Sequence, residues 1–142
     1  MQVYFNHRYM GLFSFLKKQS DKQFLSENAF ENSKAKQMSM VPLTMTELRK
    51  IEVKNDDYLK LEFFFYTNTD QKANALANEL QKLNYEVRFG TSAADKKLFV
   101  ITGWTTRMPM EDAIVVAWTK QMCELGNDFD CEFDGWGTTP DQ

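Results

Sequence analysis

The sequence has little of the side chains that usually carry chemistry: one histidine, His7, and two cysteines, Cys123 and Cys131. Because histidine is the usual acid–base group at neutral pH, its absence after residue 7 argues against histidine-dependent catalysis. The cysteines show no CxxC or Cys/His spacing, so we expect buried thiols and neither a zinc site nor a disulfide framework. These shortages predict a protein that is not an enzyme and that uses no cofactor and no metal.

Long hydrophobic runs are also missing, since no apolar stretch approaches the roughly 18 residues of a membrane span. The apolar stretch Met10–Leu16 precedes Lys17 and Lys18, which is the reverse of the order in a secretory signal. A myristoylation pattern that starts at Met10 would need Ser or Thr where Phe15 stands. We therefore predict a cytoplasmic protein that does not contact a membrane.

The chain has no basic excess of the kind that nucleic-acid binding requires. Its formal net charge is −3, and residues 111–142 hold eight Asp or Glu against one Lys. We therefore expect no direct nucleic-acid partner.

The length of 142 residues accommodates one domain of about 100 residues and an extension. Residues 1–36 are mostly polar and predict an N-terminal arm that is either mobile or docked only on a partner. Residues 37–57 predict a short helix packed on the core. Thr44–Glu47 matches a capping box, with Pro42 just upstream of the helix.

Hydrophobic periodicity over residues 58–138 predicts six elements in the order strand, helix, strand, strand, helix, strand. Their expected ranges are residues 59–66, 70–83, 85–89, 98–105, 110–125 and 127–135. Gly126 is the expected stop of the second helix. This order is typical of the ferredoxin-like α+β fold, a βαββαβ sandwich. We expect an antiparallel four-stranded sheet with two helices on one face, plus an N-terminal helical extension.

The last expected strand alternates apolar Phe129, Cys131 and Phe133 with acidic residues. A period of two places the acids together on one strand face, where like charges repel unless a cation lies opposite. We therefore predict that this face binds a basic partner through four carboxylates, Asp128, Asp130, Glu132 and Asp134.

The sheet face away from the helices is expected to carry Phe64 and Tyr66 at its centre, with Phe99 and Ile101 beside them. An apolar centre bordered by carboxylates fits a basic, partly apolar protein partner. Two points stay open from the sequence. The methionine-rich residues 38–53 could cover this centre, and Trp136 could either cap the core or contact the partner.

Asp130–Gly135 also resembles the start of a calcium loop, with Asp141 where the bidentate Glu should be. Glu132 replaces a shorter ligand, Pro140 stiffens the end, and no helix can follow. We therefore predict that no metal binds there.

Several segments resemble the RraB family of protein regulators of ribonuclease E activity. They are Leu61–Thr67, the helix with Ala73, Leu76 and Leu80, Leu83–Val87, and above all Phe133–Thr138 with its Asp-Gly-Trp. The resemblance covers residues 58–138. It implies a ferredoxin-like domain that performs no chemistry but binds the endoribonuclease and lowers its cleavage of RNA. The acidic residues would then engage a Lys/Arg-rich segment, with Phe64 and Tyr66 in apolar contact.

Two other functions remain as alternatives. One is a self-associating ferredoxin-like domain, a homodimer that binds a small molecule between open sheet faces. The other is an enzyme that uses carboxylate pairs, which would require a cleft with strongly shifted carboxyl pKa values.

Overall fold

The computed structural model describes residues 22–141. The apolar segment and the basic pair expected near the N-terminus lie outside this range. The elements in chain order are α2 (Glu27–Lys50), β1 (Tyr58–Leu59), β2 (Glu62–Thr67), α3 (Asp70–Gln81), β3 (Glu86–Thr91), β4 (Phe99–Trp104), β5 (Met108–Pro109), α4 (Asp112–Asp128) and β6 (Glu132–Gly137).

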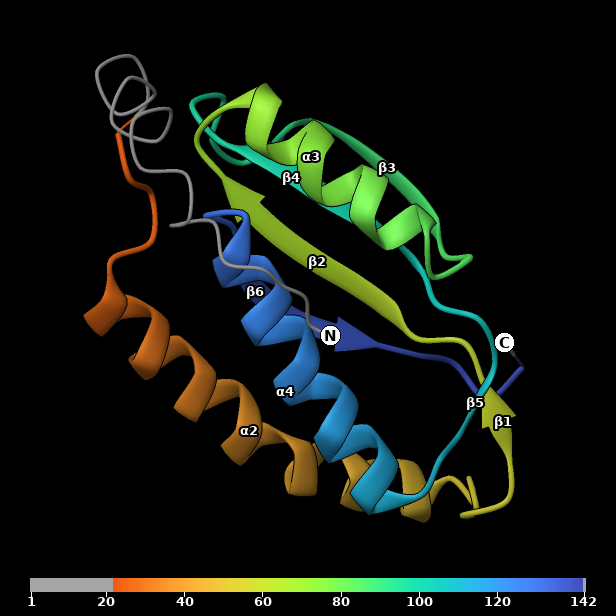
Figure 1. The fold of residues 1–142 in the computed structure, drawn as a ribbon. Helices are drawn as coiled ribbons and strands as arrows, with labels where there is room; N and C mark the ends of the chain where they lie inside the picture. Colours follow the sequence, from red (N-terminus) through yellow and green to blue (C-terminus); the bar gives the residue numbers. More distant parts are fainter. Residues whose placement is uncertain (1–21, 142) are drawn as a thin grey trace.

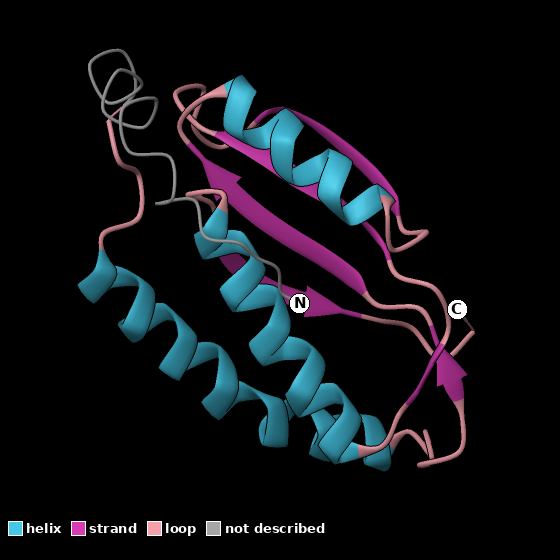
Figure 2. Ribbon diagram, in the orientation of Figure 1, coloured by secondary structure: helices cyan, strands magenta, loops and turns pink. Residues whose placement is uncertain are grey.

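The main sheet has four antiparallel strands in the order β3-β4-β2-β6, and β1 pairs with β5 in a separate two-stranded sheet. Helices α3 and α4 lie on one side of the main sheet (Figures 1 and 2). Strand order and helix placement are those of a ferredoxin-like fold. The fold class expected from the sequence is therefore confirmed, including the helical extension before the domain.

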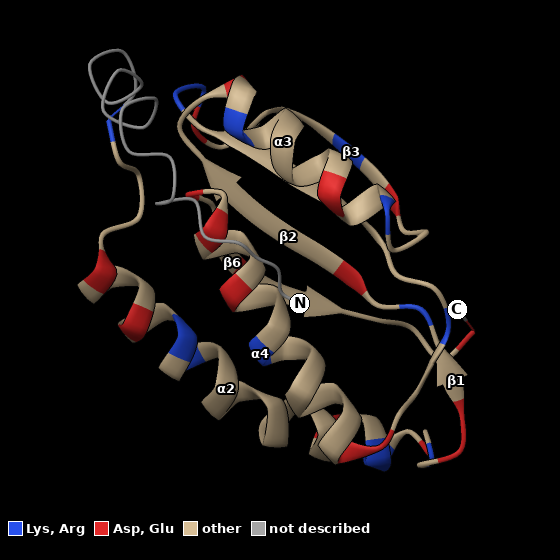
Figure 3. Cartoon of the chain, viewed as in Figure 1, with Lys and Arg blue, Asp and Glu red and all other residues tan. Residues whose placement is uncertain are grey.

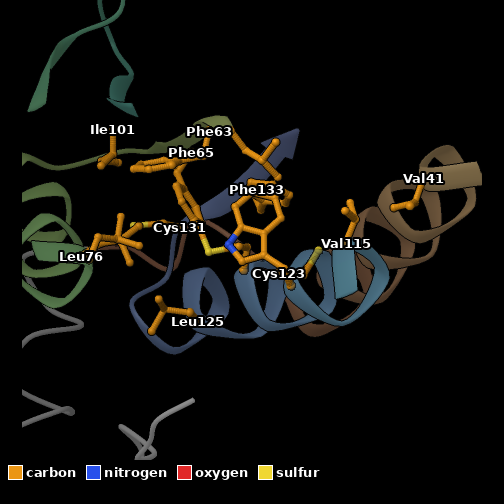
Figure 4. Close-up of a cluster of buried hydrophobic side chains, with 14 of the residues drawn as sticks. Val41, Phe63, Phe65, Leu76, Ile101, Val115, Cys123, Leu125, Cys131 and Phe133 are labelled. Atoms are coloured by element: carbon orange, nitrogen blue, oxygen red, sulfur yellow. The ribbon is translucent and has the colours of Figure 1, made fainter. Parts of the chain in front are cut away.

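Strand β2 lies in the middle of the sheet and alternates between buried and half-buried residues. Phe63 and Phe65 are fully buried on the helix side, and the Phe65 ring lies 5.1 Å from that of Phe133 on β6. Figure 4 shows these rings together with Leu76 of α3. Burying one such side chain stabilises the fold by about 1.5–3 kcal/mol, so this side of β2 anchors the core.

Helix α2 begins much earlier than the sequence predicted. Its N-cap is Ser26, whose hydroxyl accepts a hydrogen bond from the amide of Ala29 at 3.1 Å. The predicted start at Thr44 is wrong, and Pro42 lies inside the helix. Proline removes one internal helix hydrogen bond. Packing offsets this loss, because α2 buries one side against α4 and β6.

Helix α2 lies beside α4 in the helix layer (Figure 1). Its buried residues include Val41 and Met45, which belong to the main core cluster. Phe64 and Tyr66 are outside that cluster and stay half-buried. The question left open by the sequence is thereby answered: the helix that contains residues 38–50 packs on the helix side and leaves the other sheet face free.

The predicted acidic strand 127–135 is not one element. Helix α4 continues to Asp128, and β6 begins only at Glu132. Between them, Asp130 has a left-handed φ of 58°, and the Gly126 carbonyl accepts bonds from the amides of Phe129 and Cys131. Because a helix end and a turn separate the acids, their period of two does not place them on one face.

Gly126, the expected helix stop, lies inside α4 for a packing reason. A Cβ at this position would lie 2.8 Å from the carbonyl oxygen of Cys131 and 2.9 Å from the ring of Phe65. Glycine therefore allows α4 to lie close to the sheet, and the helix ends two residues later.

The predicted facing of β4 is also wrong. Ile101 is fully buried and Phe99 packs against the core, so both point to the helix side. Since strand side chains alternate, Val100, Thr102 and Trp104 point to the opposite face.

Candidate protein-binding face

The sheet face that points away from α3 and α4 is called here the open face. Directly opposed residues of antiparallel strands share a face, so the register places its side chains in three rows across β3, β4, β2 and β6. The first row is Glu86, Trp104, Glu62 and Gly137; the second is Arg88, Thr102, Phe64 and Gly135; the third is Gly90, Val100, Tyr66 and Glu132.

The centre of the open face is apolar and partly accessible. Phe64 and Tyr66 of β2 and Val100 and Trp104 of β4 are half-buried, and none of them packs against the core cluster. Two neighbouring central strands therefore present an aromatic and aliphatic surface that the core does not use. Such surfaces on soluble proteins mark interaction sites.

The charged side chains of the main sheet surround this centre. The four strands contain four acids, Glu62, Glu86, Glu132 and Asp134, and one base, Arg88. Figure 3 shows β4 without charged residues. The sheet therefore has a net negative charge and attracts a basic ligand.

Thr102 lies in the middle row of the open face, opposite Phe64 on one side and Arg88 on the other. Its side chain is 8% exposed. Its hydroxyl is the one buried side-chain polar atom within residues 22–141 that has no hydrogen-bond partner. An unsatisfied buried hydroxyl is costly, so a ligand that reaches this hydroxyl gains by supplying a partner.

Both margins of the open face contain glycines, which have no side chain to cover the backbone. An added Cβ at Gly90 of β3 or at Gly137 of β6 would meet nothing within 4 Å. Strand β6 also contains a bulge opposite Phe64 and Phe65, where Asp134 is the extra, exposed residue. A ligand on the aromatic centre can therefore approach the backbone at both margins.

The structure brings together only part of the predicted site. Phe64, Tyr66 and Glu132 share the open face, and Asp134 lies at its margin. Asp128 is the last residue of α4, and its side chain is not free of interactions.

Asp130 connects three segments of the chain through hydrogen bonds, an arrangement called here the Asp130 clasp. Its carboxylate accepts hydrogen bonds from the amides of Phe24 and Leu25 at 2.7 and 2.8 Å, and from the Lys72 ammonium at 2.7 Å. Lys72 also donates to the carbonyl of Lys22 at 2.9 Å. The clasp joins the start of the described chain to α3 and to the turn before β6, so Asp130 is already engaged.

Trp136 lies on the helix side of the sheet. Its ring packs edge-on against Trp118 of α4 at 6.3 Å, and it borders the core cluster. Of the two roles left open by the sequence, this position favours capping the core.

The strongly perturbed titratable groups lie inside the fold, away from the open face. Burial raises the pKa of the Cys123 thiol to about 12 and raises that of Cys131 further. Burial also raises the pKa of Tyr85, opposed by its hydrogen bond from Trp118. Because a thiolate is the reactive form, both thiols are poor nucleophiles at neutral pH.

Within the described residues, no group of three or more His, Cys, Asp or Glu is placed to hold a metal ion. No helix in the same part of the chain is long and apolar enough to cross a membrane.

Sequence reasoning missed four polar or aromatic members of the open face and its border: Glu62, Arg88, Thr102 and Trp104. The available signal was the alternation in residues 98–105. This alternation indicates that every second residue of the strand faces the core. It does not indicate which of the two alternating sets does so, because both sets contain large apolar residues.

No curated protein matches the chain in sequence. Residues 44–138 match the family described as RraB, "Regulator of ribonuclease activity B". This match spans α3, α4 and all four strands of the main sheet, and it begins within α2. The chain therefore belongs to the RraB family of regulators of ribonuclease activity.

Proposed function

We propose that this protein regulates an endoribonuclease such as ribonuclease E without performing chemistry, by binding the enzyme through the open face in the cytoplasm. The observation that carries the proposal is the half-buried apolar centre formed by Phe64, Tyr66, Val100 and Trp104, bordered by acids. Family membership supplies the class of partner.

The chemistry of the face favours a basic protein segment. Aromatic residues at the centre of a protein interface provide most of its binding energy. The acids Glu62, Glu86 and Glu132 stand around that centre, and complementary charge raises the rate of association. An exposed basic segment of a ribonuclease would satisfy both requirements.

Binding of this kind would lower RNA cleavage by competition. Basic segments of ribonucleases hold RNA through its phosphates. A regulator that covers such a segment weakens RNA binding while leaving the catalytic centre intact. The expected kinetic effect is a raised KM for RNA with kcat less affected.

The test uses purified ribonuclease E from the source organism and the full chain. Phe64→Ala should weaken binding at least tenfold, about 1.4 kcal/mol. Leu43→Ala is the control, because Leu43 is an apolar α2 residue that is 68% exposed, away from the open face. Affinity is measured by calorimetry, and inhibition by cleavage of a labelled RNA.

Equal affinity of Phe64→Ala and the native chain would contradict the proposed face. If the nuclease does not bind and the chain forms a concentration-dependent dimer that Phe64→Ala dissociates, the self-associating alternative replaces the proposal.

A further inference from the structure

The three rows of the open face have a spacing that a helix can match. Successive rows are two residues apart along a strand, about 6.6 Å. Residues four apart in a helix are separated by about 6 Å along its axis. The four strands together span about 14 Å, which accommodates one helix of about 10 Å diameter above β4 and β2.

The charges change sign from row to row. Glu62 and Glu86 lie in the first row, Arg88 in the second, and Glu132 in the third, while Asp134 lies at the β6 margin, at the bulge beside the second row. The side chain of Arg88 makes no ion pair or hydrogen bond with the other residues of the described chain. A ligand that covers all three rows therefore meets acids in the first and third rows and, on the β3 side of the middle row, the base Arg88.

The middle row requires an acceptor. Its members include Arg88 and Thr102, which are directly opposed residues of β3 and β4, and the Thr102 hydroxyl has no hydrogen-bond partner. A ligand with only basic residues would bring a cation towards Arg88 and leave both groups unpaired. Burying an unpaired charge or hydroxyl is unfavourable, whereas one carboxylate can accept from both.

We infer that the open face binds a helix of its protein partner with a basic–acidic–basic pattern at positions i, i+4 and i+8. The acidic residue would contact Arg88 and Thr102, and the basic residues would reach the acids of the outer rows. Apolar residues on the same side of the helix would pack on Phe64 and its neighbours. This inference rests on the proposed function and specifies the partner.

The test uses three synthetic helical peptides of 15 residues or so with one shared apolar face. One is basic–acidic–basic, one all basic, and one acidic–basic–acidic. Each is titrated into the isotope-labelled full chain and followed by NMR. The basic–acidic–basic peptide should bind at least tenfold more tightly than the other two, with the largest shifts in β4 and β2.

Two variants examine the middle row directly. Arg88→Glu should reverse the preference, so that the all-basic peptide binds more tightly. Thr102→Val keeps the side-chain shape and removes the hydroxyl, so it should reduce the advantage of the acidic residue severalfold. Both variants should fold, because Arg88 is exposed and valine is favoured in strands. Thermal unfolding of each variant checks this.

Three results with the peptides would overturn the inference: equal or tighter binding of the all-basic peptide, an unchanged preference in Arg88→Glu, or no binding of any peptide. A uridine 15-mer is tested alongside, and shifts of the same amides by this RNA alone would overturn the inference in favour of a nucleic-acid ligand. The proposed function is judged separately from the effect of Phe64→Ala on ribonuclease E. If the basic–acidic–basic peptide shows no preference but Phe64→Ala still weakens ribonuclease E binding, the inference fails and the proposed function stands.

Discussion

At the scale of single residues, the clasp at Asp130 shows how local conformation changes the meaning of an acidic residue. Asp130 has a positive φ, which Asp and Asn tolerate better than most residues. The turn directs its carboxylate to Lys72 and to the amides of Phe24 and Leu25. Those partners are about 58 and 105 residues away in the sequence, so periodicity alone could not have identified them.

Asp130→Ala should lower the free energy of unfolding by about 3 kcal/mol, because two amides lose their acceptor and the largely buried Lys72 ammonium loses its carboxylate partner. The Lys72 side chain is only 10% exposed. Asp134→Ala, at the exposed bulge, is the matched control and should change stability by less than about 0.5 kcal/mol. Urea unfolding measures both. Similar values for the two variants would show that the clasp does not stabilise the fold.

At the scale of elements, the sequence predicted the order and type of the six domain elements well but placed some ends wrongly. Long periodic segments such as α3 were predicted correctly because a narrow apolar stripe, Ala73, Leu76, Ala77 and Leu80, faces one sheet. Helix α2 was predicted only in part. Its buried side includes the polar Gln37, which conceals the helical period, and only packing against α4 and β6 compensates for Pro42.

The position of the α2 N-terminus can be tested by comparing two caps. Ser26→Ala removes the observed cap and should cost about 1 kcal/mol of unfolding free energy. Thr44→Ala lies inside the helix, where alanine is the better helix former, so it should be neutral or slightly stabilising. Chemical denaturation distinguishes the two variants. The opposite ranking would place the helix start at Thr44.

Close packing of α4 against the sheet gives a second prediction at this scale. Gly126→Ala should destabilise the protein by about 1–3 kcal/mol, because the new methyl group meets the carbonyl of Cys131 and the ring of Phe65. Gly90→Ala is the control, since its Cβ would enter open space on β3. Thermal unfolding should show a clearly lower Tm for Gly126→Ala alone, and equal Tm values would mean that α4 can move away from the sheet.

At the scale of the whole molecule, the sequence predicted the fold class and the placement of Phe64 and Tyr66 on the sheet face away from the helices. Phe64 and Tyr66 were found because β2 is apolar on both sides, which indicates a central strand. The acids were all assigned to one strand, but only Glu132 and Asp134 of these lie on β6. The carboxylates around the open face come from β2, β3 and β6, and only the register of the sheet brings them together.

Alkaline pH should destabilise the whole molecule. Burial raises the pKa of Cys123 from 9.0 to about 12 and also raises that of Cys131, so the native state keeps protons that the unfolded chain loses. This stabilisation is complete below about pH 9 and decreases as pH rises towards 12, by up to about 1.4 kcal/mol per pH unit for each thiol.

Cys123→Ser removes one of these thiols, so its unfolding free energy should decrease less steeply above pH 9 than that of the native chain. Urea unfolding between pH 7 and pH 11 gives the two slopes. Parallel slopes would show that Cys123 does not contribute to the alkaline transition.

Helix α2 has one more consequence, which follows from its place beside the outer strand β6. Gln37 of α2 is buried and lies next to Gly135 of β6, whereas the outer edge of β3 has no strand partner among residues 22–141. A sheet that is open on both edges can add copies without limit. Because its own helix flanks β6, a strand of another copy has easier access to the edge of β3, so edge-to-edge association of native copies should favour a pair over a fibre.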